Sequence, residues 1–256
     1  MQAGRLTAKA FSIVVVVLCC TLLISPLIAQ EKADLAKLAA QLKDKDFKVR
    51  RSAIEALGQL KDPAAVDLLI SSLKDDNQEV RSAAALTLGQ MGAVKSVEPL
   101  AKMLQSQNLR DRRSAIIALG TIGGERACEA LIPLLKSPSA EERDSAVAAL
   151  GGARCVRAFD PLVKALGDEN YNVRASAAMA LGDLGDKRAV EPLLAVLNNN
   201  DTDSVRTGVA VSLGVLGDRR AIEPLEKLLK TEKNENVRQQ IEYALRRLRA
   251  VQPGKQ

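Results

Sequence analysis

The side chains whose type and spacing suggest chemistry in this sequence are arginines. One arginine recurs about every 31 residues, seven residues before a leucine that recurs with the same spacing. The row consists of Arg50, Arg81, Arg112, Arg143, Arg174, Arg206 and Arg238. Such a row of cations could bind an anion or the phosphates of a nucleic acid. Because it is present in every unit, including both ends, we interpret it instead as a structural ladder that bonds carboxylates or helix-end carbonyls between units.

Residue types that support catalysis are scarce. The 256 residues contain no histidine and no tryptophan, and only three Phe and two Tyr. The absence of histidine excludes Ser-His-Asp and Cys-His catalysis and histidine-ligated metals. We therefore expect no catalytic residue, no metal site and no cofactor. The net charge of +6 would fall to +4 without residues 1–29, which gives little support to nucleic-acid binding.

Two cysteines lie outside the N-terminal segment. The repeat register places Cys128 in the first turn of a helix and Cys155 in the loop before a later one. A disulfide needs Cα atoms within about 7 Å of each other, and these two positions differ along their units. We therefore expect two buried thiols, with a disulfide as the alternative.

The N-terminal 29 residues have the pattern of an export signal. Arg5 and Lys9 precede an apolar run at residues 11–24, Pro26 interrupts it, and Ala29 offers a cleavage site before Gln30. We expect cleavage there and a periplasmic or extracellular protein. In the alternative, residues 11–28 are retained and anchor the protein in a membrane. Membrane contact is expected only in that case.

A repeat occupies residues 30–250 and leaves a polar tail at residues 251–256. Leu-Gly pairs mark six of about seven units, at Leu57, Leu88, Leu119, Leu150, Leu181 and Leu213. Four residues before each ladder arginine stands an Asp, Asn, Ser or Thr, which predicts a capped helix that ends at the glycine. A helix with an acidic first turn precedes it, and in five units a cation three residues before the acid predicts i, i+3 pairs. Alanine columns predict close helix packing.

These units resemble a known repeat family. The string Asn-Tyr-Asn-Val-Arg-Ala-Ser-Ala-Ala-Met-Ala-Leu-Gly-Asp-Leu-Gly-Asp at residues 170–186, followed by Arg-Ala-Val-Glu-Pro-Leu-Leu, is similar to the short bacterial HEAT-like repeat named after phycobilisome lyases. The resemblance implies an all-α, right-handed α-solenoid of about seven two-helix units, with the second helices on its concave side. It implies little about function, because lyase subunits, hydroxylases and scaffolds share the repeat. The iron chemistry of the related hydroxylase requires histidine, and bilin lyases act in the cytoplasm.

One column of the second helices is apolar where a solvated face would be charged. It reads Glu55, Leu86, Ile117, Ala148, Met179, Val211 and Tyr243, and Arg51, Arg113, Asp144, Gln90 and Asp183 flank it. An exposed apolar stripe indicates an interaction surface. Burial between units, or scattered surface aliphatics, would explain the column equally. The basic cluster at residues 110–113 is interpreted as solvated.

The function that this pattern favours is a non-catalytic scaffold. We expect it to bind an unidentified protein or peptide along the concave groove, and no nucleic acid. The alternative is a lyase-type or chaperone-like subunit that assists cofactor attachment or assembly.

Overall fold

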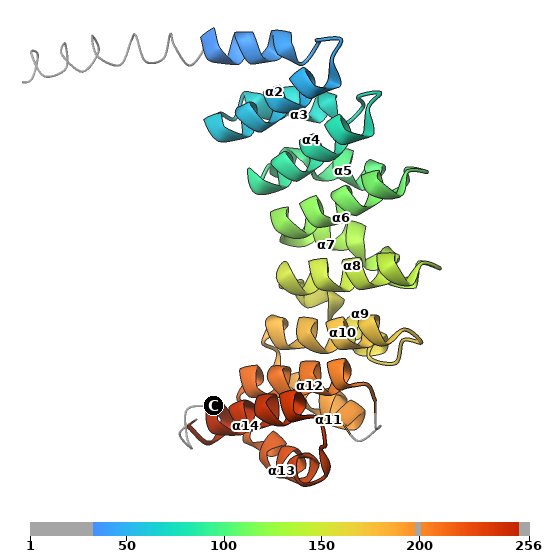
Figure 1. The fold of residues 1–256 in the computed structure, drawn as a ribbon, viewed down its shortest axis with the longest axis vertical. Coiled ribbons are helices and arrows are strands. Elements are labelled where there is room, and N and C mark those ends of the chain that lie inside the picture. The colour runs from blue at the N-terminus through green and yellow to red at the C-terminus, as the bar shows by residue number, and fades with distance from the viewer. Residues whose placement is uncertain (1–32, 198–200, 251–256) are drawn as a thin grey trace, which may run out of the picture.

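The protein is a single stack of helix pairs. The computed structural model describes residues 33–197 and 201–250, in which every regular element is a helix. The pairs follow one another along the longest axis of the molecule in the order of the sequence (Figure 1). The predicted all-α solenoid of two-helix units is confirmed. The expected export signal or anchor at residues 1–29 and the tail at residues 251–256 lie outside the described residues.

Each unit contains a shorter first helix and a longer second helix. The first helices are residues 33–41, α3 Ala65–Ser72, α5 Val97–Met103, α7 Gly124–Leu131, α9 Phe159–Ala165, α11 Val190–Leu197 and α13 Ile222–Thr231. The second helices are α2 Phe47–Leu60, α4 Gln78–Gln90, α6 Leu109–Ile122, α8 Ala140–Gly152, α10 Tyr171–Leu184, α12 Asp203–Leu216 and α14 Glu235–Ala250. Short 3₁₀ turns extend five first helices: η1 Val94–Ser96, η2 Ile132–Lys136, η3 Val156–Ala158, η4 Lys187–Ala189 and η5 Arg219–Ala221.

The second helices begin where their capping residues predict. The Asn170 side chain, for example, accepts a hydrogen bond from the backbone N–H of Asn172 at 2.9 Å. Asp46, Asn77, Asn108, Ser139 and Asn234 cap their helices in the same way. Thr202 has the extended backbone of a cap but makes no capping bond through its side chain. The cap column therefore marks the start of each second helix.

The glycine of each Leu-Gly pair does not end its helix, so that prediction was wrong. Gly151 and Gly182 lie inside α8 and α10, which run on beyond them. A Cβ built on Gly151 would lie 2.7 Å from the Cα of Ala180 in the next unit. The glycine is needed because two backbones nearly touch at this point. The left-handed residue that ends a helix comes three positions later, for example Gly185 with φ 71°.

The same close contact recurs along the second helices. Gly89 faces Ala118, Gly120 faces Ala149, and Gly214 faces Ala244. Consecutive second helices therefore pack directly against one another, whereas consecutive first helices make far fewer contacts. The second helices therefore form one continuous side of the stack. We call this surface the second-helix face.

The arginine row links each unit to the next. Arg50 bonds Asp75 at 2.7 Å, and Arg143 bonds Asp168 at 2.8 Å through Nε and also through a terminal nitrogen. Arg81, Arg112, Arg174 and Arg206 reach Asp111, Glu142, Asp201 and Glu232 of the following unit. All seven arginines, Arg238 included, also donate to backbone carbonyls that precede their own helix. Each of the first six guanidinium groups thus ties a loop of its own unit to a carboxylate of the next unit.

The acid of the ladder comes from two different positions. In most units it stands in the loop, as Asp75 and Asp168 do. In two units the loop residue is a serine, Ser106 or Ser137, and the acid lies in the first turn of the second helix, where other units have valine. There the serine hydroxyl donates to that acid, Ser137 to Glu142 at 2.7 Å. The serine and the displaced acid together replace the loop carboxylate.

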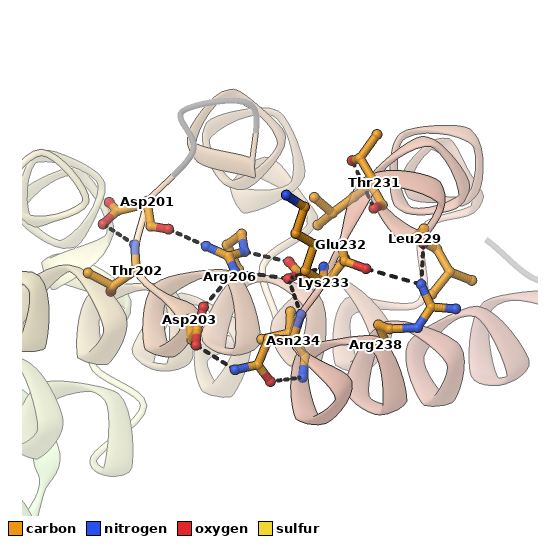
Figure 2. A network of polar contacts seen from close by, with 12 residues as sticks. Asp201, Thr202, Asp203, Arg206, Leu229, Thr231, Glu232, Lys233, Asn234 and Arg238 are labelled. Carbon is orange, nitrogen blue, oxygen red and sulfur yellow. Dashed lines mark hydrogen bonds and ion pairs between the residues drawn. The ribbon is translucent and has the colours of Figure 1, made fainter.

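The junction between the last two units shows the ladder in detail (Figure 2). Glu232 accepts from Nε of Arg206 at 2.6 Å and from the backbone N–H of Asn234 at 2.8 Å. The hydrogen bond from Arg206 is the main cause that lowers the pKa of the Glu232 carboxyl group, against the opposing effect of burial. The same cause, from Arg143 and Arg174, lowers the pKa of Asp168 and Asp201.

Across the first helices, charged residues pair between units. Lys95 bridges Asp67 at 2.5 Å, and Arg220 bridges Glu191 at 2.6 Å. These acids belong to the preceding unit, so the predicted i, i+3 pairs within one helix were wrong for these cations. The cause is the stacking offset, which brings each cation beside an acid that precedes it by 28 or 29 residues.

The same offset joins the two cysteines. Cys128 in α7 and Cys155 before η3 are 27 residues apart in sequence, with Cα atoms 5.9 Å apart, and they form a disulfide. The expectation of two separate thiols was therefore wrong. In the repeat register, the position of Cys155 in its unit comes four residues before the position of Cys128 in the preceding unit. Adjacent first helices are displaced by about one helical turn, and this displacement brings the two positions together.

The close approach of the second helices predicts opposite effects for two adjacent glycines. Gly151→Ala should destabilise the fold by about 1–3 kcal/mol because its Cβ meets Ala180. Gly152→Ala should stabilise it by up to about 1 kcal/mol, because nothing lies within 4 Å and alanine favours helix. Urea unfolding followed by far-UV circular dichroism measures both. Equal shifts in the same direction would contradict the contact.

The ladder predicts a loss of stability in acid. Because the folded-state pKa of Glu232 is lowered, its contribution is present above the unfolded-state pKa and is lost as the pH falls below about 4. Glu232→Gln should cost about 1.5–3 kcal/mol at neutral pH and reduce the acid dependence. Urea midpoints between pH 3 and pH 7 test this. The matched control is Glu242→Gln, an exposed glutamate on α14, which should change stability by less than about 0.5 kcal/mol.

Candidate partner-binding surface

The apolar column lies on the exposed side of the second helices. Ile117 in α6 is 46% exposed, Met179 in α10 is 53% exposed, and Tyr243 in α14 is 51% exposed. Leu86 and Val211 are half-buried, whereas Glu55 and Ala148 are exposed. Each side chain belongs to a different unit, and the column runs down the stack. Large apolar side chains that water can reach at regular intervals form a surface suited to a partner.

The polar residues beside the column bridge neighbouring units. Arg51 contacts Glu55 at 3.0 Å and Glu79 at 3.3 Å. Arg113 contacts Glu141 at 3.3 Å. Asp144 accepts from the hydroxyl group of Ser176 at 2.5 Å. The arginine side chains remain at least half exposed, so these pairs contribute little to stability and can exchange for contacts with a partner.

Two adjoining hollows lie on the second-helix face in the first three units. A hollow of about 410 Å³ lies between α2 and α4, and its lining includes Gln59 and Lys61. A second, of about 320 Å³, is lined by Arg51, Leu86 and Arg110 among others. Glu55, Thr87 and Gln90 line both. At this end, polar and charged groups therefore surround the half-buried Leu86.

The basic cluster at residues 110–113 divides between two roles. Asp111 is 4% exposed and accepts from Arg81, and Arg112 belongs to the ladder. Arg110 lines the smaller hollow, and Arg113 lies at the rim. The interpretation of the whole cluster as solvated therefore overlooked that Arg110 lines this hollow. Its helix position, two residues before a ladder arginine, is the signal that identifies it, since Glu79 occupies the same position one unit earlier.

The second-helix face is more apolar toward the C-terminal end. Met179, Val211 and Tyr243 are joined there by Val215, which is 42% exposed. Val215 follows Val211 by one helical turn, a spacing that would have placed it on the same face. The guanidinium group of Arg246 lies 6.0 Å from the centre of the Tyr243 ring. The face thus presents polar hollows in its first units and an apolar patch in its last ones.

The ladder arginines offer little to an external anion. Their side chains are 8% to 34% exposed, and each already donates to carbonyls and carboxylates of the protein. The described residues contain no group of three or more Cys, Asp or Glu side chains placed to hold a metal ion. Among those same residues, no helix is long and apolar enough to span a membrane. The exposed side chains and hollows of the second-helix face are therefore the candidate binding surface.

Comparison with solved structures identifies similar solenoids. A chain of the complex of CpcE and CpcF of phycocyanin lyase from Nostoc sp. PCC7120 shares 25% identity, with a TM-score of 0.53. The alignment covers 82% of this chain and 93% of that one. The Escherichia coli protein YibA shares 23% identity with a TM-score of 0.60, over 86% of this chain and 82% of that one. A search of curated proteins finds no match.

Family models match most of the sequence. The model described as PBS lyase HEAT-like repeat matches residues 142–168, which contain α9 and all but the first two residues of α8. The model described as HEAT repeats matches residues 35–120, 95–151 and 159–246. These matches span the stacked helix pairs from the first unit to the last, and the chain belongs to the HEAT repeat family.

Proposed function

We propose that this HEAT repeat protein is a non-catalytic scaffold that binds a partner protein or peptide along its second-helix face. The observation that carries the proposal is the exposed apolar column. Ile117, Met179 and Tyr243 are each about half exposed, although nothing in helix stacking requires an apolar residue there. A solvated helix face would carry Lys or Glu at these positions. Large, exposed, flexible or aromatic side chains of this kind contribute strongly to protein interfaces.

The partner that this face fits is an extended segment or a helix with mixed character. The polar hollows beside Leu86 suit a segment with charged and hydrogen-bonding groups, while the patch of Met179, Val215 and Tyr243 suits apolar side chains. Arg51 and Arg113 at the rim can exchange their exposed intramolecular partners for acidic groups of the ligand. Nucleic acid is a poor fit, because the face carries carboxylates beside its arginines.

A second function is supported by two comparisons. A chain of the phycocyanin lyase complex is 25% identical to this chain, and residues 142–168 match the PBS lyase HEAT-like repeat. A lyase-type or chaperone-like subunit would use the same face to hold a protein while a cofactor is attached. A chromophore that co-purifies with the protein and absorbs visible light would favour this function over a plain scaffold.

Export to the periplasm or the cell exterior is part of the proposal. The pattern of residues 1–29 supports it, and the disulfide between Cys128 and Cys155 supports an oxidising compartment. In the alternative, residues 11–28 keep the protein attached to a membrane while the solenoid faces the same compartment.

Intact-mass spectrometry of the protein from its own cells tests the export proposal. The expected mass is that of a chain beginning at Gln30, lighter by two hydrogens than the same chain after reduction. An N-terminus at Met1 or Gln2 with an oxidised pair would indicate the anchored form. A full-length chain with both thiols reduced would refute export.

Two matched double variants test the binding face. Ile117→Glu/Met179→Glu places charges on the second-helix face, whereas Val94→Glu/Val156→Glu places them at the starts of two first helices. Val94 and Val156 are 70% and 67% exposed, so both variants should keep the wild-type melting temperature within a few degrees. Leu86 is left unchanged because it is half-buried.

The readout is a pull-down from the cell-envelope fraction with quantitative mass spectrometry. Proteins retained by the wild type and by the Val94/Val156 variant should be depleted at least tenfold by the Ile117/Met179 variant, because a buried unpaired charge opposes docking. If all three proteins retain the same set equally, the second-helix face is not the binding surface.

A further inference from the structure

The two ends of the solenoid carry different halves of the junction that joins neighbouring units. At each internal junction, one unit supplies a ladder arginine and a glycine, and the next supplies an acid and a small residue. Arg50 bonds Asp75 and Gly58 faces Thr87, for example. Each end of the stack keeps half of such a junction. The C-terminal end keeps the side with arginine, and the N-terminal end keeps the side with the acid.

The C-terminal end is closed to further stacking. Arg238, Glu242 and Arg246 lie four residues apart on the outward stripe of α14. In the other units the position of Glu242 is buried and apolar: Ile54, Ala85, Ile116, Val147, Ala178 and Ala210. The position of Arg246 is glycine in those units. Both replacements are exposed and charged, and an arginine cannot fit at a position where even a Cβ would lie less than 3 Å from the facing residue.

The N-terminal end keeps the residue types of an internal stacking side. Val49, Ala56 and Leu60 lie on the outward side of α2 together with the exposed Ser52, whose equivalents Ser114 and Ser176 bond Ser82 and Asp144 of the preceding unit. Leu60 is 36% exposed, and Val49 and Ala56 are partly exposed. The equivalents of Val49 inside the stack are covered, since Val80, Val173, Val205 and Val237 are at most 1% exposed, and two equivalents of Ala56, Ala118 and Ala180, are at most 2% exposed. The position of Leu60 is covered less completely: Leu216 and Leu248 are buried there, whereas Met91, Ile122 and Leu184 are partly exposed. In the first helix Leu38 is also partly exposed, whereas Leu69 and Leu100 are fully buried.

The acid at this end lacks its arginine. Asp44 stands six residues before Arg50, as Asp75 and Asp168 stand before their own ladder arginines. Those two acids accept a guanidinium from the preceding unit. The Asp44 carboxylate accepts the backbone N–H of Asp46 at 2.8 Å, and no ion pair to it is formed within the described residues. Apolar shape and an unmatched charge therefore coincide at one face.

We infer that this N-terminal face docks the terminal helix pair of another α-helical repeat protein. The internal junctions define what the docking helix must carry: an arginine to pair with Asp44 and, eight residues later, a glycine to approach Ala56. Apolar residues on the same stripe cover Val49 and Leu60. The surface is separate from the second-helix face, so this docking does not depend on the function proposed above.

Two nearer occupants fit less well. A second copy of this chain presents Arg238 but then Arg246 in place of the glycine, so its end cannot close against Ala56. The chain's own residues 1–32 contain Arg5 but no glycine after it. Neither offers the required arginine and glycine on one helix.

The chain's own C-terminal helix pair serves as the docking partner once its two blocking side chains are removed. Glu242→Ala/Arg246→Gly restores the small residues that the other units carry at these positions. The purified protein, with its N-terminus as cells process it, is studied by sedimentation equilibrium. The wild type should keep one mass at all concentrations, and the variant should associate head to tail. Adding Asp44→Asn should weaken that association at least tenfold, and adding Asp183→Asn, an exposed acid of α10, should leave it unchanged.

Three outcomes would overturn the inference. In the first, the Glu242→Ala/Arg246→Gly variant keeps its helical circular dichroism signal but stays monomeric, which shows that the N-terminal face accepts no helix pair. If the double change unfolds the last unit, Arg246→Gly alone is tested instead. Association that is insensitive to both Asp44→Asn and Leu60→Glu involves another surface. Finally, the cysteine of Leu60→Cys in the otherwise wild-type protein should react with N-ethylmaleimide, which peptide mass spectrometry measures. If this cysteine is protected in the monomer, residues 1–32 occupy the face.

Discussion

Contact between the backbones of consecutive second helices is the constraint on which the rest of this structure depends. A glycine of one helix faces an alanine, serine or threonine of the next, at distances that leave no room for a larger side chain. Rings cannot be placed at such an interface, which accounts for the five aromatic residues in the whole chain. The same contact brings the second helices closer together than the first, and it leaves one column of their side chains on the side away from the core. The binding surface is therefore a consequence of the packing.

The arginine ladder tolerates sequence changes because each arginine requires a carboxylate at one point in space, which residues at different sequence positions can supply. Asp75 supplies that carboxylate from a loop, and Glu142 supplies it from a helix with the help of Ser137. The sequence of the fourth unit looks degenerate because valine is replaced by an acid, yet the structure shows a complete junction. Buried guanidinium groups cannot be left without a partner, so a change at one position is matched by another. At the N-terminal end the carboxylate of Asp44 has no ladder arginine within the described residues, and it identifies a surface that stacking has not used.

Much of the fold followed from periodicity, and so did the existence of the apolar column. Capping residues such as Asn170 located helix starts, and the alanine column predicted the close approach that Ala180 makes with Gly151. The errors share one origin. The helix stop at glycine, the intrahelical pairs of Lys95 and Arg220, and the separation of Cys128 from Cys155 were all inferred within single units. In each case the residue interacts with a neighbouring unit. Arg110 was overlooked because its hollow involves residues of α2 and α4.

The sequence by itself determined the repeat, the two helices of each unit, and the residue types in every column. These features depend on interactions within a few residues, which helical geometry makes regular. Tertiary structure decided which members of different columns meet, because adjacent first helices are displaced by about one turn, and it decided which members of the apolar column reach solvent. Docking between units depends on the shapes of all the side chains in a layer at once, so no single spacing in the sequence encodes it.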